Sequence, residues 1–149
     1  MSERYDAGMK VRRQVLGDAH VDRATAAKTE FDAPFQDMIT EGAWGTVWDS
    51  DGLTHRERSI LTIALLAGAG NFEEVAMHIR ATANTGANPK DIREAFMHVA
   101  IYCGVPKANH AFKIAKETYK KWEFPYDQKE HLYGRILSAR SLYASTRIR

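Results

Sequence analysis

Apolar residues recur at helical spacing along the chain, and this pattern constrains the fold more than any other feature of the sequence. From Pro89 to Cys103 they return every third or fourth position, and the spacing resumes up to Tyr119. Such spacing places them on one face of a helix. No window alternates apolar and polar residues with β-branched enrichment, and no internal repeat is visible. The pattern predicts an all-α fold, a small bundle of about six or seven helices with tight loops.

Capping residues indicate where these helices begin and end. Thr54 with Glu57 three residues later is a capping-box pattern, and it predicts a helix from about residue 55 to 69. Asn71 predicts a second helix over about 72–85, which Gly86 closes. Asn88-Pro89 predicts the start of a third. Gly104 then ends the third helix, and Pro106 opens the next one.

The apolar spacing also predicts which faces are buried. The residues expected inside are Ile60, Leu61, Ala64, Leu65 and Gly68 in the first of these helices, Ile92, Ala95, Phe96, Val99, Ala100 and Cys103 in the third, and Phe35, Met38 and Ile39 in an earlier helix. The first thirty residues predict one or two shorter amphipathic helices. Trp44 and Trp48 are either core residues or an interface between subunits.

Length and composition exclude several classes of protein. A chain of 149 residues with 44% apolar residues predicts a single core, which we assign to residues 1–124. Residues 125–149 form a basic extension with five basic and two acidic residues. The net charge of +2 is too small to indicate nucleic-acid binding, and no apolar run is long enough to span a membrane. Short Ala-rich helices indicate a homo-oligomer.

Cysteine usage and the first residues bear on chemistry and location. Cys103 is the single cysteine, so an intramolecular disulfide, a two-cysteine redox pair and a multi-cysteine zinc site are excluded. Its helix face predicts a buried, inert thiol. The N-terminus has no apolar segment of a secretory signal, so we expect a cytoplasmic protein.

Two Glu-x-x-x-His pairs could carry chemistry. Glu74 and His78 share a helix face, where a carboxylate can orient an imidazole for acid/base catalysis; a surface ion pair is the alternative. Glu94 and His98 repeat the spacing but lie opposite the apolar face, which predicts a solvated pair or a pair at an interface. A di-metal site would need further carboxylates and a Glu-x-x-His spacing, so no metal is expected.

The arginines and the search for nucleotide-binding motifs do little to narrow the function. Arg12, Arg13, Arg58 and Arg80 could bind carboxylates, although a single arginine more often lies on the surface. No P-loop, dinucleotide fingerprint or nucleophile elbow is present. From the residues alone, the sequence predicts a helical oligomer, and acid/base catalysis is the enzymatic activity that its residues could support.

Several strings together resemble one known family. They are Leu-Thr-His-Arg-Glu-Arg-Ser at 53–59, Glu-x-x-x-His at 74–78, Asn-x-Gly-Ala-Asn at 84–88, Asp-Ile-Arg-Glu at 91–94, Tyr-Cys-Gly-Val-Pro at 102–106 and Ala-Asn-x-Ala-Phe at 108–112. The chain is similar in these to the carboxymuconolactone decarboxylase family, of the alkylhydroperoxidase D-like fold group. The opening string from Tyr5 to Val21, Phe35-Gln and Ala43-Trp-Gly-x-Val-Trp48 resemble the members that act on 4-carboxymuconolactone itself.

The resemblance implies an all-helical homo-oligomer, with a hexamer as the expected assembly. It also implies a step of protocatechuate breakdown without a cofactor, in which 4-carboxymuconolactone loses CO2 to give 3-oxoadipate enol-lactone. The departing carboxylate lies γ to the lactone carbonyl across a double bond, so the substrate is its own electron sink. The protein then has to orient the carboxylate, stabilise the dienolate oxygen and deliver one proton.

The resemblance also implies which residues form the site. His78 is expected to donate a proton or a hydrogen bond to the dienolate, and Glu74 to orient it. Glu57 corresponds to a proton relay in the peroxidase relatives. The substrate's carboxylates are expected to meet Arg58, Arg12 or Arg13, with His20 lining the site from its own or a neighbouring subunit. The alternatives are another lactone or enol substrate, or a catalytically silent partner protein.

Three departures from the family pattern affect these expectations. Asn71 and Glu74 occupy the places of the two cysteines of the dithiol peroxidases, which excludes that chemistry. The segment before Gly52-Leu53 lacks the expected Arg-Pro, so a substrate-binding arginine is absent or has moved to Arg56. Residues 126–149 extend beyond the usual end of the family.

Overall fold

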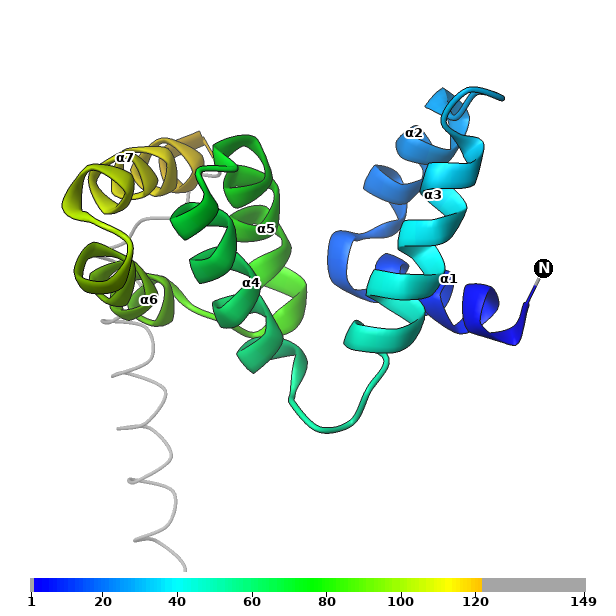
Figure 1. Cartoon of the computed structure of the whole chain (residues 1–149), viewed down its shortest axis with the longest axis horizontal. Helices are drawn as coiled ribbons and strands as arrows, with labels where there is room; N and C mark the ends of the chain where they lie inside the picture. The colour runs from blue at the N-terminus through cyan, green and yellow to red at the C-terminus, as the bar shows by residue number, and fades with distance from the viewer. Residues whose placement is uncertain (1, 122–149) are drawn as a thin grey trace, which may run out of the picture. The chain divides into compact units, whose positions relative to one another are not determined.

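A computed structural model describes residues 2–121 of the chain, and all of its regular elements are helices. Their order is α1 (Glu3–Leu16), α2 (Asp18–Ala27), α3 (Ala33–Ile39), the π-helix η1 (Thr40–Trp48), α4 (His55–Ala69), α5 (Phe72–Thr85), α6 (Pro89–Tyr102) and α7 (Val105–Lys121). Figure 1 shows this order along the ribbon, with α3 running directly into η1. The predicted all-α fold is confirmed.

The chain divides into two compact units, residues 1–115 and 116–149. The description below concerns the first unit, and α7 crosses the boundary between them. The boundary predicted between residues 124 and 125 lies outside the described residues, as does the basic extension. Within residues 2–121, no helix combines the length and the apolar content needed to cross a bilayer.

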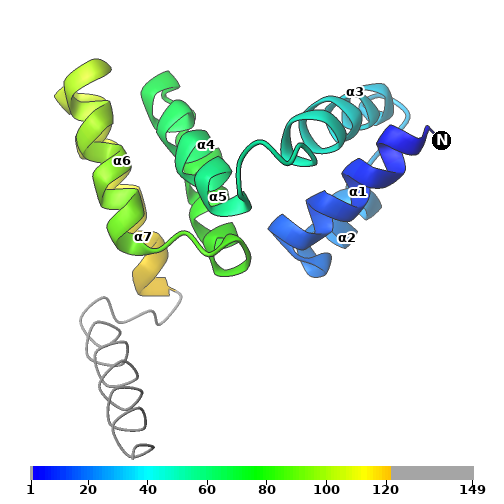
Figure 2. The same ribbon diagram turned by 90° about the horizontal axis from the view of Figure 1, so that it is seen from below.

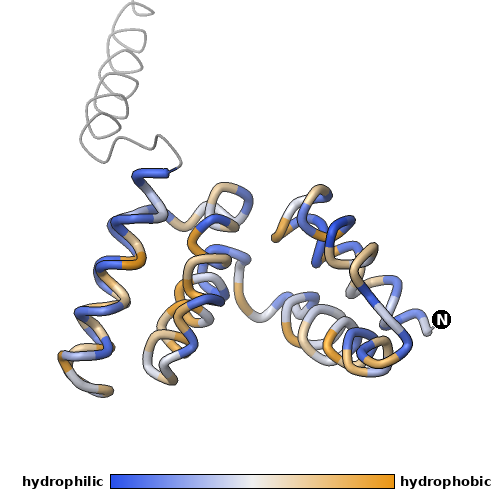
Figure 3. Tube along the Cα trace, turned by 90° about the horizontal axis from the view of Figure 1, so that it is seen from above, coloured by the Kyte–Doolittle hydropathy of each residue, from blue (hydrophilic) through white to orange (hydrophobic). Residues whose placement is uncertain are grey.

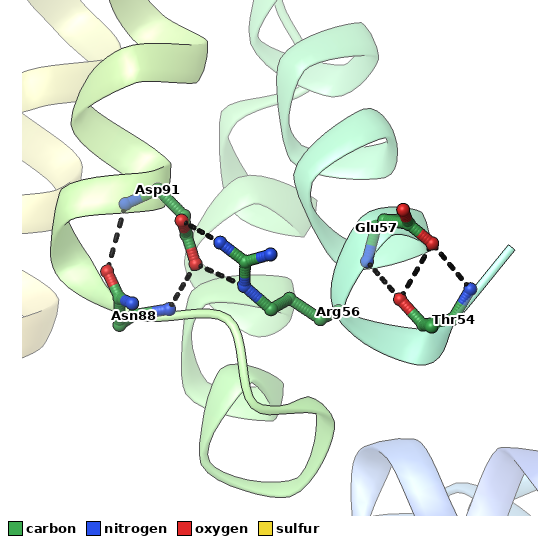
Figure 4. Close-up of polar contacts among 5 residues, drawn as sticks. All are labelled: Thr54, Arg56, Glu57, Asn88 and Asp91. Carbon is green, nitrogen blue, oxygen red and sulfur yellow. Dashed lines mark hydrogen bonds and ion pairs between the residues drawn. The ribbon is translucent and has the colours of Figure 1, made fainter.

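The predicted capping residues stand at the helix ends, and Thr54 and Asn88 cap through their side chains, whereas Asn71 precedes α5 without a side-chain capping hydrogen bond. The Thr54 hydroxyl accepts from the Glu57 backbone N–H, and the Glu57 carboxylate accepts from the Thr54 backbone N–H at 2.8 Å. Asn88 and Asp91 form the same reciprocal pair at the start of α6. Figure 4 shows both capping boxes. Gly86 ends α5 with φ 84°, a left-handed conformation that glycine adopts without strain.

The core of this unit has two parts. The first lies between α1, η1 and α5, and its buried members are Val11, Val15, Trp44, Trp48 and Ala81. The second is built by α4, α5 and α6, with buried Ile63, Val75, Ile79, Ile92, Phe96 and Val99. Figure 2 shows α1, α2 and α3 grouped together and α4 beside α5. Hydrophobic and hydrophilic residues alternate along each helix in Figure 3, as amphipathic helices require.

The π-helix is the one element that the apolar pattern does not predict. Thr40, Trp44 and Trp48, each four residues after the last, are its buried side chains. Phe35 and Met38, which were expected inside, are exposed, and Ile39 is only half-buried. Because the tryptophans already fill the space against α1, the apolar side chains one turn earlier have no core to enter. Both tryptophans are buried within the chain itself.

Gly8 on α1 and Gly45 on η1 allow the backbones of these two helices to lie in direct contact. A Cβ added at Gly8 would lie 2.2 Å from the Thr40 carbonyl oxygen and 2.7 Å from the Gly45 nitrogen. A Cβ at Gly45 would lie 2.2 Å from the Arg4 carbonyl oxygen. Real Cβ atoms do not come so close to backbone, so any side chain here would push the helices apart.

The predicted buried face of α4 is wrong. Leu61 and Leu65 are exposed, and Ser59, Ile63 and Ala67 are buried in their place. The Ser59 hydroxyl lies 2.7 Å from the Thr85 hydroxyl, which satisfies both buried polar groups. The serine of α4 therefore faces inward while Leu61 and Leu65 face outward in the single chain.

The predicted burial of Cys103 is also wrong, because its side chain is exposed. α6 ends at Tyr102, and Cys103 adopts φ −120° and ψ −8° beyond it, so it leaves the helical face that its spacing assigned. Its sulfur lies against Gly68 of α4, where an added Cβ would come within 2.8 Å.

We predict that Gly8→Ala destabilises the fold by about 1–3 kcal/mol, the usual range for forced overpacking, and by more than the control. Gly42→Ala is the matched control, because it lies in η1 with open space around its Cβ position. The control should change stability by less than about 1 kcal/mol. Urea unfolding measures both. Equal stability of the two variants would contradict the close approach of α1 and η1.

Candidate active site

His78 on α5 lies beside the two buried tryptophans. Its side chain is 7% exposed. Its ring centroid is 6.4 Å from that of Trp44 and 6.1 Å from that of Trp48, with interplanar angles of 17° and 16°. The two indole centroids are 5.2 Å apart. The imidazole is therefore held nearly parallel to both indoles in surroundings that contain little water.

Burial determines the charge of this imidazole. Loss of solvation lowers the pKa of His78 from 6.5 to about 4. The Glu74 charge acts in the opposite direction and His20 in the same direction, but burial dominates. At neutral pH His78 is therefore an uncharged imidazole.

The contacts of the His78 ring differ from those expected of a Glu–His pair. Among residues 2–121, its Nδ1 atom is buried and has no hydrogen-bond partner. Glu74 is exposed and acts on His78 only through its charge. A surface ion pair does not describe this histidine either, because the ring is buried. Packing against the tryptophans, rather than a carboxylate, sets the orientation of the ring.

Arg12 on α1 is a buried cation on the same side of the core. Its side chain is 8% exposed, and burial lowers the pKa of its guanidinium. Nη1 donates to the Thr40 hydroxyl at 3.3 Å and Nη2 to the Gln36 side-chain oxygen at 3.5 Å. Both partners are neutral. Nε is buried and has no partner in the described part of the chain.

His20 connects these groups electrostatically. Burial lowers the pKa of His20, and the charges of Arg23, Arg12 and Arg80 lower it further. His20 in turn lowers the pKa of His78. His20 on α2 is thus within electrostatic range of both His78 on α5 and Arg12 on α1, three of the residues that the sequence proposed. The region carries positive charge, which suits an anionic ligand.

Glu57 has a structural partner, although His55, two residues before it, lies 5.9 Å from Trp48 between ring centroids. Its carboxylate accepts from the Thr54 backbone N–H and hydroxyl, each at 2.8 Å, and these hydrogen bonds lower its pKa. Arg56 beside it donates from Nε to Asp91 at 2.9 Å and pairs with the same carboxylate through Nη2. Figure 4 shows this link between the capping boxes of α4 and α6. Arg56 is therefore not a free substitute for the missing arginine.

Arg13 and Arg58 also have partners of their own. Arg13 pairs with Asp18 at 3.0 Å and with Asp22 at 2.8 Å, and these contacts raise its pKa. Arg58 donates from Nη2 to the Ser50 carbonyl oxygen at 2.9 Å. Nothing in these contacts directs either guanidinium toward His78.

The second Glu-x-x-x-His pair is solvated, as predicted. Glu94 and His98 are both exposed on α6. Within residues 2–121, no group of three or more His, Cys, Asp or Glu side chains is arranged to hold a metal ion.

Sequence reasoning did not assign the tryptophans, Gln36 or Thr40 to the site. These four residues recur every fourth position as Gln36, Thr40, Trp44 and Trp48. That spacing puts two polar groups and two indoles along one side of a continuous helix. This shared side was the one indication in the sequence that the four side chains act together; their contacts with Arg12 and His78 come from the structure.

Comparison with known proteins gives consistent matches. The family model described as "Carboxymuconolactone decarboxylase family" matches residues 33–117, a range that includes His78 and both tryptophans but not Arg12 or His20. A nitrosuccinic acid decarboxylase of Metarhizium robertsii is 42% identical over 114 residues, 76% of this chain and 80% of that protein. A 4-carboxymuconolactone decarboxylase of Acinetobacter baylyi is 39% identical over 118 residues, 79% and 88% of the two chains. A sequence of the same name from Pseudomonas putida is 60% identical over 43 residues, 29% of this chain and 90% of that sequence.

The lowered pKa of His78 predicts a pH dependence of stability. Between pH 6.5 and about pH 4 the unfolded chain protonates this residue and the folded chain does not, so stability falls as the pH falls. From pH 7 to pH 4.5 the loss due to His78 should be about 2 kcal/mol. Urea unfolding at both pH values should show a smaller loss in His78→Gln than in the unsubstituted protein.

His98→Gln is the control, since His98 is exposed. It should keep the full pH dependence. If His78→Gln keeps it as well, His78 protonates equally in the folded and unfolded chains, and the neutral buried imidazole is wrong.

Proposed function

The chain belongs to the carboxymuconolactone decarboxylase family, and on that premise we propose that it decarboxylates 4-carboxymuconolactone to 3-oxoadipate enol-lactone without a cofactor. Relatives that span most of the chain are named as decarboxylases, which supports a carboxy-lyase activity in general. The hypothesis that it is a silent partner protein is less well supported, because a buried imidazole and a buried unpaired guanidinium are costly features without a ligand.

The reaction needs little covalent help from the protein. The bond between the carboxylate and the ring carbon breaks, and its electron pair moves through the double bond into the lactone carbonyl. CO2 leaves, and a dienolate remains. One proton then adds to the carbon next to the carbonyl and gives the enol-lactone. The barrier depends on stabilising the negative oxygen and supplying that proton.

The buried, neutral His78 beside two adjacent indoles is the observation that carries the proposal. Apolar walls favour the step in which a carboxylate loses its charge and leaves as CO2. A neutral imidazole donates a hydrogen bond to the dienolate oxygen. To donate a proton it must first take one up, and the two negative charges of the bound substrate favour that uptake. Both roles place His78 next to the reacting atoms.

The other proposed residues have graded support. Arg12 supplies positive charge for the substrate's carboxylates, whereas the lowered pKa of His20 suits it to hydrogen bonding as a neutral imidazole. Glu74 contributes a charge that favours a protonated His78. Glu57, Arg58 and Arg13 stay predictions from the family resemblance, and each has a partner unrelated to His78.

Nitrosuccinate is the second candidate substrate, because a relative at 42% identity is named for it. It shares two features with the lactone: a carboxylate on a carbon next to a strong electron sink, and a second carboxylate on the neighbouring CH2 group. Other lactone or enol acids with these features are the wider alternative.

We further propose that the active form is a homohexamer in the cytoplasm, serving protocatechuate breakdown. The support for an oligomer is a set of exposed apolar side chains on α4, α6 and the start of α7: Leu61, Leu65, Met97, Ile101, Tyr102 and Val105. Leu65 is 72% and Tyr102 81% exposed. Light scattering at micromolar concentration should give a closed oligomer. A monomer would contradict this proposal.

The activity is tested with purified protein and enzymatically generated 4-carboxymuconolactone, followed by loss of the lactone in the ultraviolet. Nitrosuccinate is assayed in parallel by release of CO2. Turnover of the lactone supports the proposal. Turnover of nitrosuccinate alone supports the second candidate, and no turnover of either contradicts both.

Variants of His78 separate its two roles. His78→Ala should lower kcat by roughly 10²–10⁴, the usual effect of removing a general acid. His78→Gln keeps a hydrogen-bond donor and should recover much of the rate if His78 only stabilises the dienolate, but little if it donates the proton. Glu74→Gln should have a smaller effect, because Glu74 acts only through charge. Steady-state kinetics measures all three, and circular dichroism verifies the fold.

His98→Ala is the matched control on an exposed helix face and should keep the kcat of the unsubstituted protein. Rates within a few-fold for all the His78 and Glu74 variants would remove this pair from the mechanism.

A further inference from the structure

We propose that Gln36 and the free edge of the Arg12 guanidinium form the subsite for the carboxylate that the product retains, which makes Gln36 a specificity-determining residue. This assignment rests on the proposed function, since it concerns a substrate with two carboxylates. It concerns a side chain to which neither the family resemblance nor the reaction itself assigns a role.

The first argument is the unpaired charge of Arg12. Its guanidinium is buried, yet its contacts are a hydroxyl and an amide oxygen, both neutral. A buried charge normally has an opposite charge beside it, because loss of solvation is otherwise uncompensated. The neighbouring charges that affect His20 are also positive, from Arg12, Arg23 and Arg80. An anion from outside the chain is the partner that balances this region.

The second argument is which edge of the guanidinium is available. Nη1 is held by Thr40, whose hydroxyl donates at 2.8 Å to the Gln36 backbone carbonyl and so has a fixed position. Nη2 reaches the Gln36 side chain only at 3.5 Å, the outer limit of a hydrogen bond. Nε is buried without a partner among the described residues. Nε is also closed off from solvent, so a carboxylate reaches the edge formed by Nε and Nη2, side-on and with two parallel hydrogen bonds, only once the Gln36 side chain has turned away.

Gln36 is suited to select such a ligand. It is half-buried, so its side chain can turn without opening the core. As it stands, its oxygen accepts weakly from Nη2. Rotation of the amide presents its NH2 group to a carboxylate on Arg12, which replaces one weak hydrogen bond with a charge-assisted one.

The third argument identifies the carboxylate. The departing carboxylate loses its charge in the transition state, so an arginine bound to it would stabilise the ground state and slow the reaction. The retained carboxylate keeps its charge throughout, so binding it to Arg12 carries no such penalty. The departing group is better accommodated near Trp44, Trp48 and the neutral His78. Binding of the retained carboxylate is then uniform along the reaction and affects KM rather than kcat.

Two variants of Gln36 and one control test the subsite. Gln36→Glu supplies an internal carboxylate to Arg12, and Gln36→Met removes the hydrogen bond while keeping the size. Gln14→Glu adds the same charge at an exposed position of α1. We would measure KM and kcat for the lactone, binding of succinate by isothermal titration calorimetry, and the thermal unfolding midpoint.

Gln36→Glu should raise KM and weaken succinate binding by about tenfold or more, because the new carboxylate occupies the edge of Arg12. Its unfolding midpoint should stay equal or rise, since Arg12 gains a partner. Gln36→Met should weaken both by roughly threefold to tenfold, the contribution of one hydrogen bond. In both, kcat should stay within a few-fold, and Gln14→Glu should match the unsubstituted protein. Arg12→Gln should bind succinate weakly if it folds.

Three results would overturn the subsite: no succinate binding by the unsubstituted protein, equal succinate binding by Gln36→Glu, or a fall in kcat without a change in KM. Failure of the proposed function would appear differently. In that case the lactone is not turned over, while succinate still binds and the Gln36→Glu effect on binding persists.

Discussion

The contact of α1 with η1 at Gly8 and Gly45 is the constraint on which the rest of the site depends. Backbone meets backbone there, so the two helices lie closer than any pair of side chains would allow. One turn after Gly8, Arg12 comes within reach of Thr40 and Gln36. Trp44, on the other side of the same contact, packs with Val11 and Val15 and lies beside His78. Two glycines thus determine which helix faces share one small volume.

Much of the fold could be predicted because local interactions encode it. The capping boxes at Thr54 and Asn88 need only residues three apart in sequence, and they begin α4 and α6 where the sequence indicates. The errors come from tertiary contacts. The pattern of α4 favours Leu61 and Leu65 as buried, but another face, on which Ser59 pairs with the hydroxyl of Thr85, lies inward. Ser59 and Thr85 are 26 residues apart, so the spacing of apolar residues in either helix does not predict that they form a hydrogen bond.

The candidate site shows the same division. His78 could be proposed from spacing and from the family resemblance, but its environment could not, because the indoles beside it come from a π-helix thirty residues earlier. Family resemblance ranked Arg12 and Arg13 equally, since sequence alone does not distinguish adjacent arginines. The structure distinguishes them by burial: Arg13 pairs with two aspartates at the surface, and Arg12 is enclosed without an acid. Glu57 looked catalytic because a capping carboxylate and a proton relay look the same in one sequence.

Asp91 takes part in two interactions at once. Its carboxylate caps the start of α6 through Asn88 and also binds the guanidinium of Arg56 on the first turn of α4. Asp91 thereby links the first turns of α4 and α6, two helices that begin 34 residues apart in sequence. Fraying at either start breaks the shared ion pair and loosens the other, so the two ends should exchange their amide hydrogens as a single cooperative unit rather than as independent termini.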